Sequence, residues 1–444
     1  MIVEKSPYPH TLFLEYALDP AKIGRRSDFS SKGLYKRAEK VLHGYSSQTK
    51  LAPIAFTVGI NELLLDKDEN WYIDYTSGTY CSALGHGNNY IAEKVYKQLF
   101  QLSNCHSWLT ELKVEVCERL KETFPSSSEL SQFEFYCDGT TAVEAALRLV
   151  HLYRSGGTIV AFTGAFHGKS SGAALLTERP VKGSLGIETD PERCNPTFDR
   201  LPYPAKGKGW TPEEFGKLLI RVQRPISGIF VEPIQGVSGC VEPEDWFLPM
   251  LARVCRLEGC LLVMDEIFTG GRRTGEMWAY SKYDEVDPDI VLFGKILGGG
   301  LPLSGLAMKP GVPELLEGSS TTTTYGGNPV SLAACSASLD ILQHPETIHN
   351  IEEIGQIMKT TLSLLDCEIR GRGCMFGFDL SCDGEQVFKR LIDRGVLTQI
   401  EGSTVRLCPP LTSRPEVIER GAKIIVETIK EVTYLEGEKP RGCE

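Results

Sequence analysis

The amino-acid sequence predicts an α/β protein in which helices wrap a mostly parallel central sheet and a smaller α/β lobe completes the chain. Two observations lead to this prediction. Short apolar segments of strand length alternate along the chain with helical segments of about 10 to 20 residues. Polar, glycine-containing loops directly follow the apolar segments, at the sheet edge where proteins of this class bind ligands. The predicted strands are residues 133–137, 158–162, 228–231, 261–264 and 290–293.

The segments before the first of these strands follow other patterns. Residues 1 to about 50 are polar and contain several prolines, which predicts an irregular arm. Residues 54–75 alternate apolar and polar side chains between turn residues, which predicts a small antiparallel meander. Residues 89–102 and 109–124 have helical periodicity.

The sequence pattern at the end of the chain predicts a separate, smaller lobe. A long helix is expected from Pro329 toward Leu342, a strand at 375–380 and a final helix at 415–435. We therefore expect three parts. Residues 1–75 form an arm and a segment of the small domain, residues 76–330 form the large ligand-binding domain, and residues 331–444 form the C-terminal small domain.

Charge and composition exclude several classes of function. The net charge is -11, which disfavours a nucleic-acid or anionic-membrane partner because such partners need a basic surface. The 14 cysteines are scattered without a CxxC pair or zinc-finger histidines, so we expect reduced thiols and no metal site. No apolar run is long enough to span a membrane. The sequence therefore predicts a cytoplasmic protein without a membrane anchor.

Two residues at the ends of predicted strands carry the strongest chemical signal. Asp265 ends one apolar strand, and Lys295 follows the next strand and precedes the glycine run 298–300. A lysine in an apolar setting can lose its proton and attack an aldehyde, while a nearby carboxylate can keep a pyridine nitrogen protonated. An enzyme that holds pyridoxal 5'-phosphate as a Schiff base needs both of these groups. The alternative is a buried structural ion pair.

Three further loops follow predicted strands. Asp138, Gly139 and Thr140 open a helix whose amides suit a phosphate, although a simple helix cap would look the same. Phe166 could stack on a flat ring beside His167, although a core phenylalanine and a surface histidine fit equally well. Glu232 begins a polar cluster that could equally be an ordinary turn.

Two later segments offer groups for a phosphate and a carboxylate. The hydroxyl-rich stretch 322–324 could contact a phosphate through its hydroxyls and amides, or be plain turn chemistry. Arg406 lies in a strand-like context, where its guanidinium could clamp a substrate carboxylate or form an ordinary surface ion pair.

Taken in this order, these residues resemble the class III (subgroup II) aminotransferases, a fold-type I family that depends on pyridoxal phosphate. The family includes ornithine, acetylornithine, 4-aminobutyrate and many omega-amine transaminases. The most specific part of the resemblance is the stretch 265–275 with Lys295 downstream.

The resemblance implies roles for these residues. Lys295 is the Schiff-base lysine and general acid/base, and Asp265 contacts the pyridine nitrogen. Thr324 reaches the phosphate of a neighbouring subunit, so the resemblance implies a homodimer. Arg406 binds the substrate carboxylate, in a pocket that includes Val237 and Tyr80. The remaining cofactor-binding residues are expected to be Asp138, Gly139, Thr140, Phe166, His167, Glu232 and Phe268.

Four positions depart from the family pattern. Asp138 and Thr141 stand where the family usually has serine and glutamate, and Phe268 stands where it often has glutamine. Val237 stands where amine-specific members often carry a glutamate that pairs with the carboxylate-binding arginine. Arg406 is therefore either permanently available to a carboxylate or neutralised by another acid.

The expected function is transfer of an amino group from an amino acid or omega-amine donor to a keto acid or aldehyde acceptor by a ping-pong mechanism. An aminomutase, racemase or decarboxylase on the same fold is the alternative, because a fold does not fix the reaction. A non-catalytic relative is disfavoured, since this chain keeps both Asp265 and Lys295.

Overall fold

The computed structural model describes residues 31–42, 52–105, 108–178, 198–316 and 321–437. The chain divides into two compact units, a larger one (Glu93–Leu342) and a smaller one (Met1–Ala92 with Gln343–Glu444). Most of the expected N-terminal arm, residues 1–30 and 43–50, lies outside the described residues, and α1 (Ser31–Ala38) is helical.

The unit boundaries differ from those expected at residues 75 and 330. Helix α10 (Pro329–Gln343) packs with the larger unit almost to its end, because Arg119 forms an ion pair of 2.7 Å with Asp340 on this helix. The segment after residue 75 stays with the smaller unit, where the Ser77 hydroxyl donates to the carbonyl of Cys408 at 2.6 Å.

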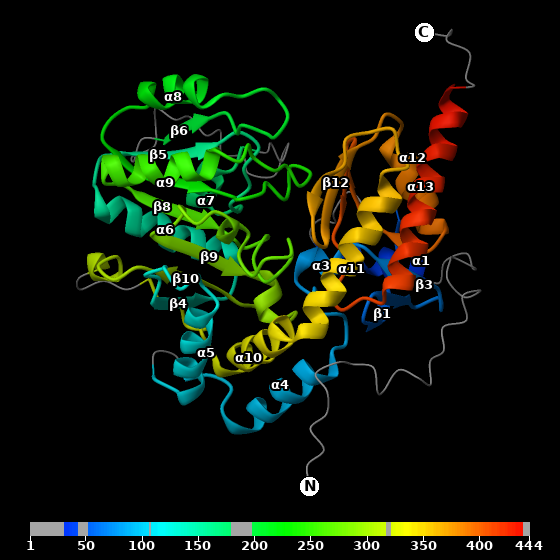
Figure 1. Ribbon diagram of the computed structural model, residues 1–444. Helices are drawn as coiled ribbons and strands as arrows, with labels where there is room; N and C mark the ends of the chain where they lie inside the picture. The colour runs from blue at the N-terminus through cyan, green and yellow to red at the C-terminus, as the bar shows by residue number, and fades with distance from the viewer. Residues whose placement is uncertain (1–30, 43–51, 106–107, 179–197, 317–320, 438–444) are drawn as a thin grey trace. The chain divides into compact units, whose positions relative to one another are not determined.

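The larger unit contains a seven-stranded sheet in the order β4-β10-β9-β8-β7-β5-β6 (Figure 1). All neighbouring pairs are parallel except the two that involve β10, so the predicted mostly parallel sheet is confirmed. The sequence did not predict β6 or β10. The strands are β4 (Gln132–Tyr136), β5 (Thr158–Phe162), β6 (Phe198–Leu201), β7 (Ile226–Val231), β8 (Leu261–Asp265), β9 (Ile290–Gly294) and β10 (Ser304–Met308).

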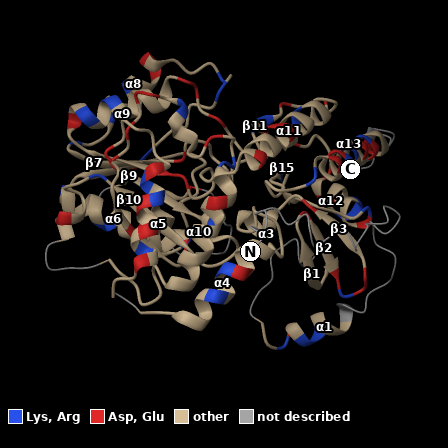
Figure 2. Ribbon diagram, turned by 60° about the horizontal axis from the view of Figure 1, so that its bottom comes forward, with Lys and Arg blue, Asp and Glu red and all other residues tan. Residues whose placement is uncertain are grey.

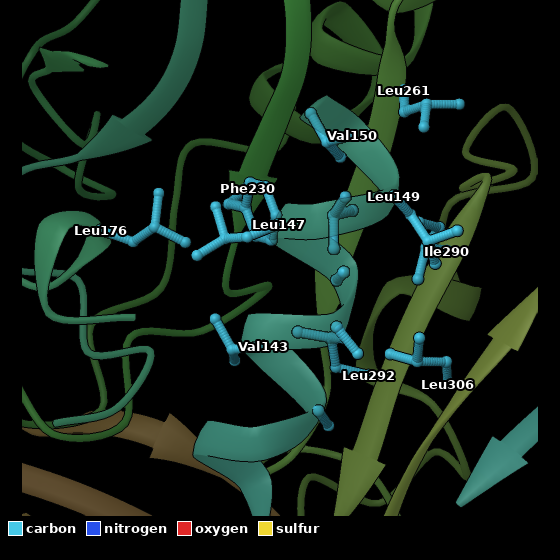
Figure 3. Packing of buried hydrophobic residues seen from close by; sticks show 14 of the residues in the cluster. Val143, Leu147, Leu149, Val150, Leu176, Phe230, Leu261, Ile290, Leu292 and Leu306 are labelled. Atoms are coloured by element: carbon cyan, nitrogen blue, oxygen red, sulfur yellow. The ribbon is translucent and has the colours of Figure 1, made fainter. Parts of the chain in front are cut away.

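Helices cover both faces of this sheet. On one face, α6 (Gly139–Tyr153) packs Val143, Leu147 and Val150 against apolar residues of the strands (Figure 3). On the other face, Phe162 packs against Phe215 and Phe247. Each fully buried side chain of this kind contributes about 1.5 to 3 kcal/mol. The other helices of the unit are α5 (Glu111–Glu122), α7 (Ser171–Leu176), α8 (Pro212–Arg221), α9 (Phe247–Glu258), η4 (Ala279–Lys282), η5 (Lys295–Gly298) and η6 (Pro313–Leu316).

The smaller unit has two four-stranded sheets. One contains the predicted antiparallel meander and gains β13 as a parallel fourth strand. The other is antiparallel, in the order β11-β12-β15-β14. The first comprises β1 (Phe56–Ile60), β2 (Leu63–Asp66), β3 (Trp71–Asp74) and β13 (Val396–Leu397), and the second β11 (Arg370–Arg372), β12 (Met375–Asp379), β14 (Gln399–Glu401) and β15 (Thr404–Leu407). The helices are α3 (Ser77–Tyr80), α11 (Pro345–Leu362), α12 (Gly384–Asp393) and α13 (Pro415–Gly437).

Charges of both signs are interspersed on the outer helices. Figure 2 shows basic and acidic residues close together along the ribbons of α4 (Asn89–Gln101) and α5. Among the helices of the described ranges, none combines the length and apolar character needed to cross a bilayer.

Candidate active site

Asp265 lies buried at the carboxyl end of β8, with 5% of its surface exposed. Its Oδ2 atom is 2.7 Å from Nδ1 of His167, and its Oδ1 accepts a hydrogen bond of 3.0 Å from the amide of Ile267. Burial lowers the pKa of His167, but the hydrogen bond and negative charge of Asp265 outweigh burial and leave this pKa above its ordinary value. Charge and hydrogen bonds thus compensate the buried carboxylate.

Lys295 lies at the same edge of the sheet as Asp265. Strand β9 runs parallel to β8, and Leu292 on β9 pairs with Asp265 on β8. Lys295 comes three residues after Leu292 in the chain. Its backbone has φ of 44°, a left-handed conformation that turns the chain sharply after the strand. Its Nζ atom lies 4.3 Å from the centre of the Phe268 ring. The half-buried amine therefore rests on an aromatic face.

Phe268 connects the lysine to the loop that contains Val237. A Cβ atom on Gly236 would overlap the Phe268 ring, so the ring packs directly on the backbone of this glycine. Val237 follows and is half-buried. Phe268, in the position where the family often has glutamine, thus makes an apolar contact instead of a polar one.

Glu232 holds two of these loops together. Its buried carboxylate accepts hydrogen bonds from the amides of Phe166 at 2.9 Å and Gly236 at 3.3 Å. Burial raises the pKa of Glu232 to about 7. The charge of Asp265 adds to this rise, and the charge of His167 partly offsets it. Both of these bonds go to backbone amides of the protein, so Glu232 acts as a positioning residue for the loops of Phe166 and Gly236.

The start of helix α6 has the features of a phosphate-binding loop. Asp138 is the N-cap of this helix, and its carboxylate accepts from the amide of Thr141 at 2.9 Å. The Asp138 carboxylate is therefore hydrogen-bonded to the first turn of its own helix. Thr140 Oγ1 lies 2.8 Å from Ser170 Oγ, a contact that the sequence analysis missed because 30 residues separate the two positions. The amides of Gly139 and Thr140 belong to the positive end of the helix.

Thr324 lies in an exposed loop of the larger unit. Its carbonyl oxygen accepts a hydrogen bond of 3.3 Å from the side chain of Asn104. Residues 317–320, which precede this loop, lie outside the described residues.

Arg406 and Tyr80 belong to the smaller unit. Arg406 is buried on β15, and its Nη2 atom is 3.3 Å from Oε2 of Glu401. The Tyr80 hydroxyl donates to Oε1 of Gln399 on the neighbouring strand. Glu401 is therefore the acid that pairs with Arg406, while position 237 is valine. Sequence reasoning did not identify Glu401, because its proximity to Arg406 depends on the register of a hairpin.

The sequence model of the family described as Aminotransferase class-III matches residues 45–429. The chain belongs to the class III aminotransferases. The family resemblance inferred from the motifs is therefore confirmed, and pyridoxal phosphate is the cofactor of this family. The donors at the sheet edge fit that cofactor: an amine at Lys295, a compensated carboxylate at Asp265 and helix amides at Gly139.

Individual relatives span nearly the whole chain. A LysW-aminoadipate semialdehyde/glutamate semialdehyde transaminase of Sulfolobus acidocaldarius is 31% identical over 84% of this chain and 94% of that protein. An acetylornithine aminotransferase of Methanopyrus kandleri is 29% identical over 85% and 95%. An alanine/serine racemase of Pyrococcus horikoshii is 28% identical over 96% of both proteins.

Solved structures share the fold. An ornithine aminotransferase from Toxoplasma gondii has a TM-score of 0.81 at 22% identity and covers 92% of this chain and 96% of that one. An (S)-enantioselective omega-transaminase from Thermomicrobium roseum has a TM-score of 0.79 at 25% identity and covers 92% and 99%. These likenesses confirm the predicted fold of type I transferases.

The raised pKa of Glu232 predicts a pH-dependent stability. The pKa of Glu232 is about 7 in the folded protein, against an ordinary value of 4.5. Its contribution to the free energy of unfolding is therefore complete below pH 4.5 and is lost as pH rises through 7. Glu232→Gln cannot ionise and should escape this loss, which amounts to about 3 kcal/mol at most. Thermal unfolding at pH 5 and pH 8 should therefore show a smaller difference in Tm for the variant than for the wild type. Glu213→Gln, on the exposed side of α8, is the control, and an unchanged difference in Glu232→Gln would contradict the assignment.

Proposed function

We propose that this protein transfers an amino group from an amino acid or omega-amine to a keto acid or aldehyde in two half-reactions at one site, with pyridoxal phosphate linked to Lys295. The observation that carries the proposal is that Asp265, bonded to His167, and Lys295 lie at the carboxyl ends of two adjacent parallel strands. Membership of the class III aminotransferases supports it independently.

Each residue contributes a distinct physical effect to this function. The bound cofactor supplies an electron-withdrawing ring that stabilises negative charge at the substrate's α-carbon. Lys295 Nζ takes the proton from that carbon and returns it. Asp265 would be the partner of the ring nitrogen, and its carboxylate is held in place by His167 and the Ile267 amide. Phe166 offers its ring as a flat contact surface.

The phosphate and carboxylate ends of the ligands have candidate partners as well. The amides of Gly139 and Thr140 would bind the phosphate at the positive end of α6, where the Asp138 carboxylate accepts a hydrogen bond from the Thr141 amide. Arg406 is the proposed partner of the carboxylate of acid substrates, and Tyr80 and Val237 are the other proposed substrate-binding residues. The apolar surface of Phe268 and Val237 favours substrates with some hydrophobic bulk.

Lys295→Ala tests the central assignment. The variant should lose transamination by at least about a hundredfold, because the proton-transfer group is missing. Borohydride reduction followed by peptide mass spectrometry should find the cofactor attached to Lys295 in the wild type and to no lysine in the variant. Lys282→Ala, which removes a surface ion pair with Asp245, is the control and should keep both properties. Retained turnover in Lys295→Ala would refute the role.

A racemase is the second candidate, favoured by the Pyrococcus horikoshii relative, which is a racemase and matches 96% of this chain. Both activities would use the same lysine and acid. They differ in the fate of the nitrogen, which leaves the substrate in transamination and stays on it in racemisation.

The two candidates separate when the cofactor-loaded enzyme meets one enantiomer of an amino acid without any keto acid. A transaminase should release about one equivalent of keto acid per site and then stop, because no acceptor regenerates the cofactor. A racemase should continue through many turnovers to the opposite enantiomer. Chiral chromatography and keto-acid assay of the same samples measure both outcomes, and continued racemisation without keto acid would overturn the transaminase proposal.

We also propose that the protein acts as a homodimer in the cytoplasm on small-molecule substrates. Tyr96, Phe100 and Trp108 form part of an exposed apolar stretch at the end of α4 and the start of the following segment. Such stretches mark interfaces. Asn104 lies within it and contacts Thr324, so the loop expected to reach the second subunit borders this surface. The scattered cysteines, which include no CxxC pair, favour a reducing compartment.

Charge introduced into this surface should weaken the dimer. Phe100 is 76% exposed in the single chain, so Phe100→Glu costs the fold little but places a carboxylate in the interface. Sedimentation velocity should show a shift toward monomer and a parallel loss of cofactor affinity through Thr324. Leu257→Glu, at a 77% exposed position on α9, is the matched control and should stay dimeric. A dimer unaffected by Phe100→Glu would exclude this surface.

A further inference from the structure

The hairpin formed by β14 and β15 places Glu401 beside Arg406. Gln399 pairs with Arg406 and Glu401 pairs with Thr404, so all four side chains belong to one face of the sheet. Glu401 and Arg406 are diagonal neighbours, a separation that long side chains bridge. The two-residue turn begins with Gly402 at φ of 61°, which fixes this register.

The two partners of this ion pair are buried to very different extents. The Arg406 side chain is 8% exposed, whereas the Glu401 side chain is 56% exposed. The guanidinium is therefore fixed in the protein, while the carboxylate can move into solvent and keep its hydration. Pairs with one exposed partner change an equilibrium by about two- to fivefold, which is weak enough for a bound ligand to displace the acid.

The other polar groups on this face are held more firmly. The Tyr80 hydroxyl donates to Gln399, which lies opposite Arg406. Tyr80 ends a run of four residues with positive φ, from 46° at Ser77 to 73° at Tyr80. Left-handed backbone in residues other than glycine costs free energy and persists only where the surroundings enforce it. Glu401 is thus the exposed, movable member of an otherwise fixed polar group.

We propose that Glu401 is a specificity-determining residue that occupies Arg406 when the substrate has no carboxylate there and yields the guanidinium to a substrate that has one. The inference rests on the proposed function, in which Arg406 is the carboxylate-binding residue. A site of this kind accepts an acid in one half-reaction and a neutral amine or aldehyde in the other, because the charge of Arg406 is compensated in both.

The acid that performs this task is local to the arginine. Position 237, where amine-specific members of the family often carry the pairing glutamate, is valine here. In this chain the acid lies five residues before Arg406 on the adjacent strand. The partner is thus built into the same hairpin as the arginine.

Glu401→Gln in the cofactor-loaded enzyme tests the proposal. A carboxylate no longer competes for Arg406, so KM for L-2-aminobutyrate and the inhibition constant of butyrate should each fall about two- to fivefold. KM for propylamine, which lacks the carboxylate, should rise because Arg406 loses its counter-charge. The ratio of kcat/KM for the two donors therefore shifts toward the amino acid, whereas a purely structural role would affect both donors alike.

Asp379→Asn is the matched control. Asp379 lies on β12 opposite Thr404 and pairs with Arg370 at 2.7 Å, so the variant removes the same charge from the same sheet without touching the Arg406 pair. An equal fall in KM for L-2-aminobutyrate in both variants would overturn the proposal, as would unchanged constants in Glu401→Gln. If Glu401→Gln is poorly folded, Glu401→Asp shortens the side chain, keeps its charge and should show the same direction of change. Loss of transamination with every donor in the wild type would instead refute the proposed function.

Discussion

The buried carboxylate of Asp265 is the interaction on which the candidate active site depends. An ionised group in the interior must be compensated by charge and hydrogen bonds, and His167 together with the Ile267 amide provides both. This requirement ties the loop after β5 to the end of β8. Glu232, at the end of β7 between them, lies in the same buried region, and burial raises its pKa to about 7. The cluster thus joins the loops after three strands of the sheet.

The central sheet could be predicted from the sequence because strands buried on both faces are continuous apolar runs. Four of the five predicted strands match observed ones to within one residue at each end, and the fifth, β7, begins two residues earlier than expected. Strand β10 escaped prediction because Ser304 and Gly305 break its apolar pattern, and its position between β4 and β9 is a long-range pairing. Strand β13 has only two residues, too few for any periodicity.

The site was predictable where function requires a residue type at a strand end, as at Asp265 and Lys295. It was not predictable where partners meet through tertiary structure. The contact between Thr140 and Ser170 joins two separate loops, and the pairing of Arg406 with Glu401 depends on hairpin register. Glu232 was expected among the cofactor-binding residues, and its two hydrogen bonds to the amides of Phe166 and Gly236 give it a positioning role. Residue type therefore predicted location better than it predicted contacts.

The packing of Phe268 on Gly236 constrains how this site can diverge. The ring occupies the space that any side chain at position 236 would need. Homologous chains that carry a larger residue at 236 must therefore carry a smaller or differently oriented one at 268, so the two positions should covary. Because Phe268 also supports the amine of Lys295, such a paired exchange would alter the environment of the lysine together with the shape of the pocket. Substrate range and the packing around Lys295 are thereby linked during evolution of this chain.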